Sequence, residues 1–341
     1  MKGKAEILAF TKGQTHPEVL EMIELAGRTC YKSADKITPG SAEKFIQTIL
    51  RSGHESVIEH SWFVVMFGKC GSSQEQNYCD YFLNILTKNG LFSLTEKADR
   101  FILSGNARMF RDYFRAQGKT SMSAKIGMDG DLATLLLKTP ALFTDLDLNP
   151  NPNRYYGNRN QIKISPEIDF TREEKLAHFW AMARFTGCSR AFTHQLVRHR
   201  ITAISQESQR YCDESGFFEN GYFVVPPSFE EAGLADWFIS KMKEIDGWYR
   251  KAQEFQTSDG RRLVKNEDAR FLLPNAVCSE IVMSANLKEW RWILKMRCDV
   301  HAQWEIRQMA MDLLREFQSL FPDCFDDFAI SDDGKSAKFV K

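Results

Sequence analysis

The sequence RHRITAISQESQRY, residues 198–211, concentrates three arginines, one histidine and two serines in a short stretch. An apolar-to-amphipathic segment, residues 179–197, runs directly into it. Arginine grips phosphate or carboxylate through paired hydrogen bonds and keeps its charge, so the stretch favours an anion-binding site. A solvated helix end with a basic last turn is the alternative. That alternative accounts for the first half of the stretch but not for Ser208 and Arg210, which follow at once.

The segment before this stretch predicts how it is presented. Residues 177–185 favour a strand, and residues 187–189 favour a turn into a helix that Ser189 can cap. This helix would run to about Arg198 and place Gln195 and Arg198 on one face. We therefore expect the stretch to begin at a helix end and to continue as a loop that can curl over a ligand.

We predict a mixed α/β protein with a central sheet flanked by helices, in one domain over residues 1–341. Residues of about 70–176 form a loop-rich insertion within it, because prolines and an asparagine cluster interrupt its periodicity. The other predicted strands are residues 6–10, 62–67, 101–103 (followed by a turn at 104–106), 222–225 and 277–285. Helices are predicted from His16, from Ser41 as a cap to Gly53 as a stop, near residues 109–114, at 234–255 and 268–274, from Asn286, and at 302–320, before a frayed tail from Ser331.

The segment GHESVIEH, residues 53–60, places two histidines beside two glutamates. A zincin helix would need a histidine at Ile58, and the inverted motif would need one at Ser56, so we predict no metal site. His54 and His60 are separated by about 240° of helical rotation and should face apart. A structural turn and polar contacts to an organic ligand remain the two alternatives.

The composition restricts the class of protein. Lys+Arg and Asp+Glu both total 45, which gives no general attraction to nucleic acid or to an anionic membrane. We see no signal peptide and no membrane-spanning run, and expect a soluble cytoplasmic protein. The eight cysteines form no Cys-x-x-Cys pair, so neither a zinc knuckle nor a redox pair is predicted.

Arginines gather at or near the predicted element ends, where binding residues concentrate. This number of cations suits a nucleotide site, and without a glycine-rich phosphate loop the nucleotide would be held by side chains. Ion pairs are the alternative, for Arg270 with Glu267 or Asp268 and for Arg297 with Asp299 or Glu305. No nucleophile stands out, so we expect a cofactor to carry the chemistry. The arginines concerned are Arg198, Arg200, Arg210, Arg270 and Arg297.

The spacing of Arg198-His199-Arg200, seven residues and then Ser208 resembles the signature of flavin-dependent thymidylate synthases. Arg210-Tyr211 extends the match. Three further segments resemble the family in the same order, and together the motifs cover about two-thirds of the chain. They are Gly53 to His60, Asp268 to Pro274, and the segment from Asn286 through Arg297 to Glu305.

The resemblance implies an activity. Such enzymes transfer a methylene from methylenetetrahydrofolate to dUMP and reduce it with flavin hydride, which yields dTMP. The cofactor is FAD, NADPH usually reduces it, and no nucleophilic cysteine takes part. The family is typically homotetrameric, with sites at subunit interfaces that bind these small molecules.

The resemblance also assigns site residues. Ser208 and Arg297 would be catalytic, Arg210 and Arg270 would bind the dUMP phosphate, and His54 would lie near the flavin or folate. Contacts to dUMP would come from Gln195, Gln206, Ser208, Arg210, Arg270 and Arg297. Contacts to FAD would come from Ser56, Glu59, Arg198, His199, Arg200, Ile201, Asn286 and His301.

Some positions depart from the family pattern. The family often has serine, asparagine and glutamate where Ala203, Ser205 and Gln206 stand, and Glu207 comes one residue later. Cys30 and Trp292 also differ. These departures motivate a second hypothesis, a non-catalytic nucleotide-binding or regulatory protein that keeps the arginines. A third, an RNA-binding module, is disfavoured by the zero net charge.

Overall fold

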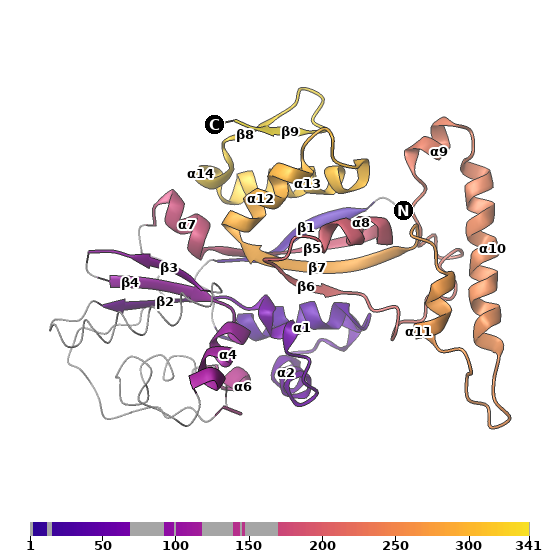
Figure 1. Ribbon diagram of the computed structural model, residues 1–341, viewed down its shortest axis with the longest axis horizontal. Helices are drawn as coiled ribbons and strands as arrows, with labels where there is room; N and C mark the ends of the chain where they lie inside the picture. Colours follow the sequence, from indigo (N-terminus) through magenta and orange to yellow (C-terminus); the bar gives the residue numbers. More distant parts are fainter. Residues whose placement is uncertain are drawn as a thin grey trace.

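The computed structural model describes residues 3–11, 16–68, 92–98, 100–117, 139–143, 145–146 and 170–340. A central four-stranded sheet crosses the middle of the molecule, with helices on both faces (Figure 1). Each neighbouring pair of strands in this sheet is antiparallel. The predicted mixed α/β class with a flanked central sheet is therefore confirmed. The strand order is β1 (Lys4–Phe10), β5 (Trp180–Ser189), β7 (Cys278–Asn286) and β6 (Ala203–Gln206).

The two faces of β5 follow the period of two that strand geometry dictates. Ala181, Ala183 and Phe185 join the hydrophobic cluster beneath α12 and α13, whereas Trp180 and Met182 join the cluster with α1 and α2. Both faces of the sheet are thus covered, as Figure 1 shows. These helices are α1 (His16–Thr29), α2 (Ser41–Arg51), α12 (Leu287–Arg297) and α13 (Trp304–Leu320).

A second, three-stranded sheet lies at one end of the molecule (Figure 1). This sheet shares a hydrophobic cluster with α1 and α2 through side chains such as Phe101 and Leu103, and Phe110 of α4 and Leu142 of α6 join the same cluster. The rest of the predicted insertion lies outside the described residues, and its status as an insertion stays a prediction. The elements are β2 (Phe63–Gly68), β4 (Arg100–Gly105), β3 (Ser93–Glu96), α4 (Ala107–Gln117) and α6 (Pro140–Phe143).

At the opposite end, the long helix α10 packs over a small cluster around Phe217 and Met242 (Figure 1). Within the described ranges, no helix is both long and apolar enough to cross a membrane. The remaining elements are η1 (Ala34–Lys36), η2 (Glu55–His60), α7 (Arg172–His178), α8 (Arg190–Leu196), α9 (Pro227–Glu231), α10 (Ala235–Glu254), α11 (Asn266–Ala269), η4 (Arg270–Leu272), α14 (Pro322–Phe325), β8 (Phe328–Ile330) and β9 (Ala337–Phe339).

Local capping chemistry sets several helix starts. Ser189 accepts from the Phe192 N–H and caps α8, and Asn286 caps α12 in the same way, as predicted. Ser41 is not the cap of α2, because Gly40 occupies that position with φ of 79°. The Ser41 hydroxyl instead donates to Glu24 at 2.6 Å, which ties α2 to α1.

Five local predictions are wrong, and pairing with another segment of the chain explains most of them. Residues 187–189 continue β5 through a bulge instead of turning, since their pairing with β7 continues. Residues 203–206 form β6 rather than a loop, and residues 104–105 extend β4. Residues 222–225 form only an isolated bridge between Phe223 and Val277. The tail from Ser331 forms the hairpin of β8 and β9 rather than a frayed end.

Candidate functional site

The end of α8, the end of α12 and the start of α13 bring four predicted or neighbouring polar residues together. Arg297 donates from Nε to His199 Nε2 at 3.1 Å and from Nη2 to the Gln195 carbonyl at 3.2 Å. The Gln195 amide donates to Gln303 Oε1 at 3.5 Å. We call Gln195, His199, Arg297 and Gln303 the helix-end cluster. Three of its members were predicted as ligand contacts, and Gln303 was not.

His199 is neutral in this cluster. Burial and, to a smaller extent, the positive charge of Arg297 together lower the pKa of His199 to about 4. Its Nε2 therefore carries a lone pair that accepts from Arg297. The alternative ion pairs of Arg297 are not formed. Asp299 instead bonds to His301, and Glu305 accepts from the Ser189 backbone and hydroxyl.

A second group forms where the loop after β6 meets α11. Arg210 lies with its guanidinium 5.2 Å from the Tyr211 ring centre and donates to Glu267 Oε2 at 3.4 Å. Arg270 donates to the Glu267 carbonyl at 3.1 Å rather than to a carboxylate. Glu267 thus holds both arginines that were predicted to bind phosphate. The Arg210 side chain is 53% exposed, so an incoming anion can replace its single, long ion pair.

Ser208 stands two residues before Arg210 in the loop after β6, and hydrogen bonds hold its backbone and its hydroxyl. Its N–H donates to the Cys30 carbonyl at 3.0 Å, and its hydroxyl accepts from the Arg210 N–H at 3.3 Å. Burial raises the pKa of the neighbouring Cys212 thiol to about 11, which disfavours a thiolate nucleophile. The hydroxyl of Ser208 can therefore orient a ligand, and the residues around it offer no activated nucleophile.

Strand alternation separates Gln206 from Glu207. Gln206 is half-buried and donates to Ser279 at 3.5 Å, whereas Glu207 and Ser205 are buried on the opposite face. The Glu207 carboxylate therefore points to the other face of the strand and cannot take the place of the glutamate that the family often has at position 206. On that opposite face Ser205 bonds to His60 at 3.0 Å.

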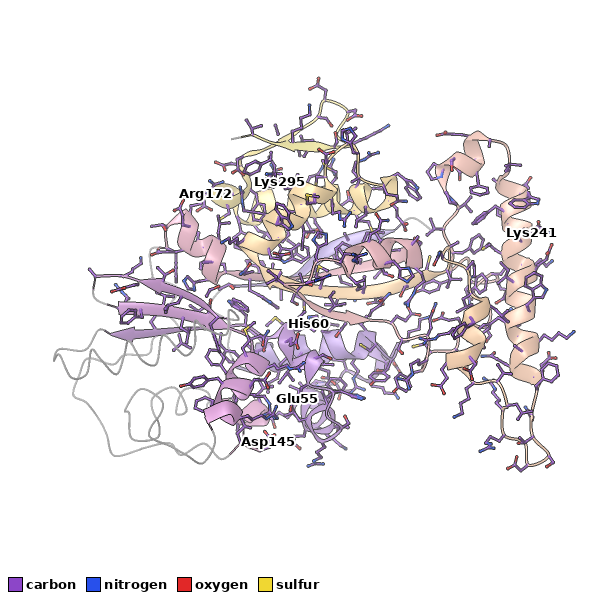
Figure 2. The ribbon with its side chains drawn as sticks, in the orientation of Figure 1. Glu55, His60, Asp145, Arg172, Lys241 and Lys295 are labelled. Atoms are coloured by element: carbon purple, nitrogen blue, oxygen red, sulfur yellow. The ribbon has the colours of Figure 1, made fainter. Side chains whose placement is uncertain are left out.

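The η2 segment separates its two histidines as predicted. His60 is fully buried between the central sheet and α1 (Figure 2), and its Nδ1 lies 2.7 Å from Ser284 Oγ. Burial lowers the pKa of His60 to about 3, so it is a neutral structural residue. His54 is exposed, and its Nδ1 lies 3.5 Å from the Tyr31 hydroxyl. In the part of the chain that the structure describes, no three His, Cys, Asp or Glu side chains gather as a metal site would require.

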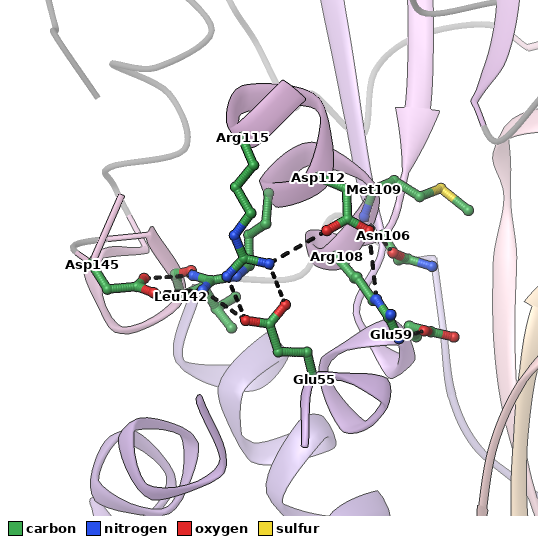
Figure 3. A network of polar contacts seen from close by, with 10 residues as sticks. Glu55, Glu59, Asn106, Arg108, Met109, Asp112, Arg115, Leu142 and Asp145 are labelled. Carbon is green, nitrogen blue, oxygen red and sulfur yellow. Dashed lines mark hydrogen bonds and ion pairs between the residues drawn. The ribbon is translucent and has the colours of Figure 1, made fainter. Parts of the chain in front are cut away.

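Arginines from α4 hold η2 in place, and none of them is among the predicted site residues (Figure 3). Arg111 is fully buried and forms two bonds of 2.6 Å to the Asp145 carboxylate and one of 3.1 Å to Glu55. Arg115 adds a bond of 2.6 Å to Glu55. Arg108 pairs with Glu59, one of the predicted flavin contacts, at 2.7 Å. The spacing of three arginines at positions 108, 111 and 115 on one helix face was the available signal.

A cavity of about 480 Å³ opens between α1, α2 and the start of η2. Its lining combines the aromatic rings of Tyr31 and Phe45, the cations of Arg28 and Lys44, and His54. Aromatic walls with a few charged groups suit a planar ligand that carries negative charge.

The residues predicted to contact FAD fit an anionic, partly apolar cofactor. Arg198 and Arg200 are exposed and form no ion pair with any described residue, so their charges are available to a diphosphate. Ile201 beside them is 75% exposed, which leaves apolar surface for a ring system. The remaining predicted contacts, Ser56, Asn286 and His301, are exposed or half-buried at the ends of η2 and α12.

A family model described as "Thymidylate synthase complementing protein" matches residues 13–74 and 171–323. Three curated relatives are named flavin-dependent thymidylate synthase. The protein from Nitratidesulfovibrio vulgaris is 41% identical over 141 residues, 41% of this chain and 56% of the relative. The protein from Pyrococcus abyssi is 37% identical over 155 residues, which is 44% of this chain and 59% of the relative. The protein from Mycolicibacterium gilvum is 33% identical over 191 residues, which is 53% of this chain and 74% of the relative. The match thus spans less than two thirds of the length of the first two relatives.

Proposed function

Because the chain belongs to the thymidylate synthase complementing protein family, we propose that it is a flavin-dependent thymidylate synthase. It would convert dUMP to dTMP with methylenetetrahydrofolate as the one-carbon donor, FAD as cofactor and NADPH as reductant. The observation that carries the proposal is the pairing of Arg210 and Arg270 around Glu267, beside Ser208. Two guanidinium groups, one half-exposed and one half-buried, that both bond to one residue suit a nucleotide monophosphate.

We assign the dUMP contacts accordingly. Arg210 and Arg270 would bind the phosphate in place of their bonds to Glu267, and Ser208 would contact the sugar and base region. Gln195 and Arg297 would reach the base from the helix-end cluster. Since His199 is neutral, Arg297 keeps its charge uncompensated there and can stabilise negative charge that develops on the uracil ring. Gln206, half-buried on β6, would contribute through its amide.

We assign the flavin contacts to the residues that the family resemblance predicts, most of which are exposed or half-buried. Bound FAD would supply the hydride and the redox chemistry. Arg198 and Arg200 would bind its phosphates, and Ile201 would pack against its rings. Ser56, Glu59, His199, Asn286 and His301 would supply hydrogen bonds, with His54 and its cavity near the flavin or folate.

A homotetramer with sites at subunit interfaces is part of the proposal. Its support is the apolar surface exposed next to the candidate site, where Phe271 is 85% and Ile201 75% exposed. Light scattering on the purified protein would measure the mass in solution, and a monomer at micromolar concentration would contradict this part. Location in the cytoplasm stays a prediction.

The test of the function is an assay on the purified protein. We expect flavin absorbance and dTMP formation from dUMP, methylenetetrahydrofolate, NADPH and added FAD. A purified protein that shows no flavin absorbance and forms no dTMP would refute the proposal.

A non-catalytic nucleotide-binding protein is the second candidate. It is favoured by Ala203, Ser205 and Gln206, which differ from the family pattern, although Ser205 here has a structural bond to His60. Such a protein would bind dUMP without turnover, so the same assay separates the two.

A further inference from the structure

Lys32 stands directly after α1 in an unusual backbone conformation. Its φ of 46° is the only positive value at a non-glycine residue in the described part of the chain. A side chain with a Cβ is strained in this region and persists there only where its surroundings hold it. The contacts of the ammonium group show what holds it.

The Lys32 ammonium lies against two buried carboxylates. Its Nζ is 2.6 Å from Glu207 Oε1 and 3.1 Å from Glu214 Oε2, and 4.6 Å from the ring centre of Tyr222. The side chains of Glu207 and Glu214 are 1% and 2% exposed. Glu207 Oε2 also accepts from the Tyr222 hydroxyl and from the Glu280 N–H, both at 3.1 Å.

The two carboxylates stand at the two ends of one loop, residues 207–214. This 207–214 loop carries Ser208 and Arg210, the residues that we assign to dUMP. Further contacts tie it to the segment of Lys32. The Ser208 N–H donates to the Cys30 carbonyl at 3.0 Å, and the rings of Tyr31 and Tyr211 lie 5.3 Å apart. One lysine therefore bridges both ends of the loop from a segment 182 residues away from Glu214.

We propose that Lys32 and Glu214 are positioning residues that hold the 207–214 loop in the shape that binds a nucleotide monophosphate. This inference rests on the proposed function, because that function assigns dUMP to Ser208 and Arg210. When both ends of the loop are fixed, the Arg210 guanidinium is already in place. Less conformational entropy of the loop is therefore lost when the ligand binds. Lys32 and Glu214 themselves need not touch the ligand.

Protonation of Glu214 is part of this arrangement. Burial, together with the hydrogen bond and the negative charge of Glu207, raises the pKa of Glu214 to about 8. With a proton on Glu214, the remaining charges of Lys32 and Glu207 cancel. The other titratable groups that face Glu214 are Arg190 from α8, Cys212 in the loop, Tyr222, and Tyr249 from α10. Loss of the proton above about pH 8 would place a second negative charge beneath the loop and weaken dUMP binding.

The first experiment measures dUMP dissociation constants by calorimetry on the full chain with FAD added. Lys32→Met should raise the dissociation constant by about tenfold, because the Glu207 carboxylate is left without its cation. It should raise the KM for dUMP more than it lowers kcat. Lys32→Arg, which keeps the charge, should restore most of the affinity. The matched control is Lys36→Met, which removes an exposed lysine with no ion pair to a described residue and should bind within about twofold of wild type.

The second experiment tests the proton and remains valid even if Lys32→Met does not fold. Wild type should show a dissociation constant for dUMP that is several-fold higher at pH 9 than at pH 7. Glu214→Gln, which cannot ionise, should remove most of that ratio. Equal affinities of wild type and Lys32→Met, or an unchanged pH ratio in Glu214→Gln, would overturn the inference. Failure of wild type to bind dUMP at all would instead overturn the proposed function.

Discussion

At the residue scale, Arg210 is the side chain on which the proposed substrate site most depends. It is half-exposed, and its one carboxylate contact among the described residues, to Glu267, is 3.4 Å long. Such an exposed pair contributes little stability, so the arginine is held ready at small cost to the fold. Loss of Arg210 should therefore affect ligand binding more than folding.

Arg210→Ala should weaken dUMP binding by about 10- to 100-fold, in line with about 1.5–3 kcal/mol for a hydrogen bond to a charged group. Glu267→Gln is the matched control with the opposite sign. It removes the carboxylate that competes with the phosphate for Arg210 and leaves the carbonyl that Arg270 uses, so binding should stay equal or tighten. Calorimetric titration with dUMP measures both variants. Unchanged affinity in Arg210→Ala would refute its assignment to the phosphate.

At the element scale, η2 owes its place to α4. A 3-10 segment of six residues has few hydrogen bonds of its own, and Glu55 and Glu59 both depend on arginines from α4. The Arg115 hydrogen bond lowers the pKa of Glu55, and the Arg111 hydrogen bond lowers that of Asp145, so both carboxylates are charged at neutral pH. The segment with the predicted flavin contacts Ser56 and Glu59 is therefore supported from outside the residues that the family model matches.

Arg111→Met should lower the free energy of unfolding by about 2–3 kcal/mol. This loss of stability is no larger than the loss that usually follows when a buried ion pair is broken. The reason is that Glu55 keeps its ion pair with Arg115, and that Asp145 is half-exposed. Arg115→Met, at a side chain that is 41% exposed, should cost no more than about 1 kcal/mol. Urea denaturation compares the two variants. Equal losses in both would show that burial of Arg111 is not what holds η2.

At the scale of the whole molecule, buried neutral histidines link the sheets and helices. His60 joins η2 to β6 and β7, and His178 joins α7 to β3 and β4 through Thr95 at 2.8 Å and Ser104 at 2.9 Å. Burial lowers the pKa of His60 to about 3 and those of His178 and His199 to about 4. Each therefore resists protonation in the folded state.

Stability should consequently fall as the pH drops from about 6.5 toward 4. In that window the unfolded chain binds protons at these histidines and the folded chain does not, so acid favours unfolding. The carboxyls with lowered pKa, such as Glu55, act in the same direction near pH 4, and Glu214, whose pKa is raised, offsets part of the loss. Urea denaturation at pH 7.5 and pH 5 should differ by a few kcal/mol, and His60→Gln should reduce the difference. As the control, His301→Gln replaces an exposed histidine and should leave the stability difference between the two pH values unchanged. Equal stability of the wild type at pH 7.5 and pH 5 would contradict the prediction.

The sequence by itself determined the local chemistry of this protein. The caps at Ser189 and Asn286 and the long helix α10 depend on interactions within a few residues. Tertiary structure decided what depends on partners far along the chain. β6 is a strand because β7 pairs with it, and the C-terminal tail is tied to the end of α12, where the Ala337 N–H donates to the Cys298 carbonyl at 2.8 Å. No local sequence pattern predicts the ion pairs of Lys32 with Glu207 and Glu214 either. These charges can be buried only because the folded chain brings oppositely charged partners together.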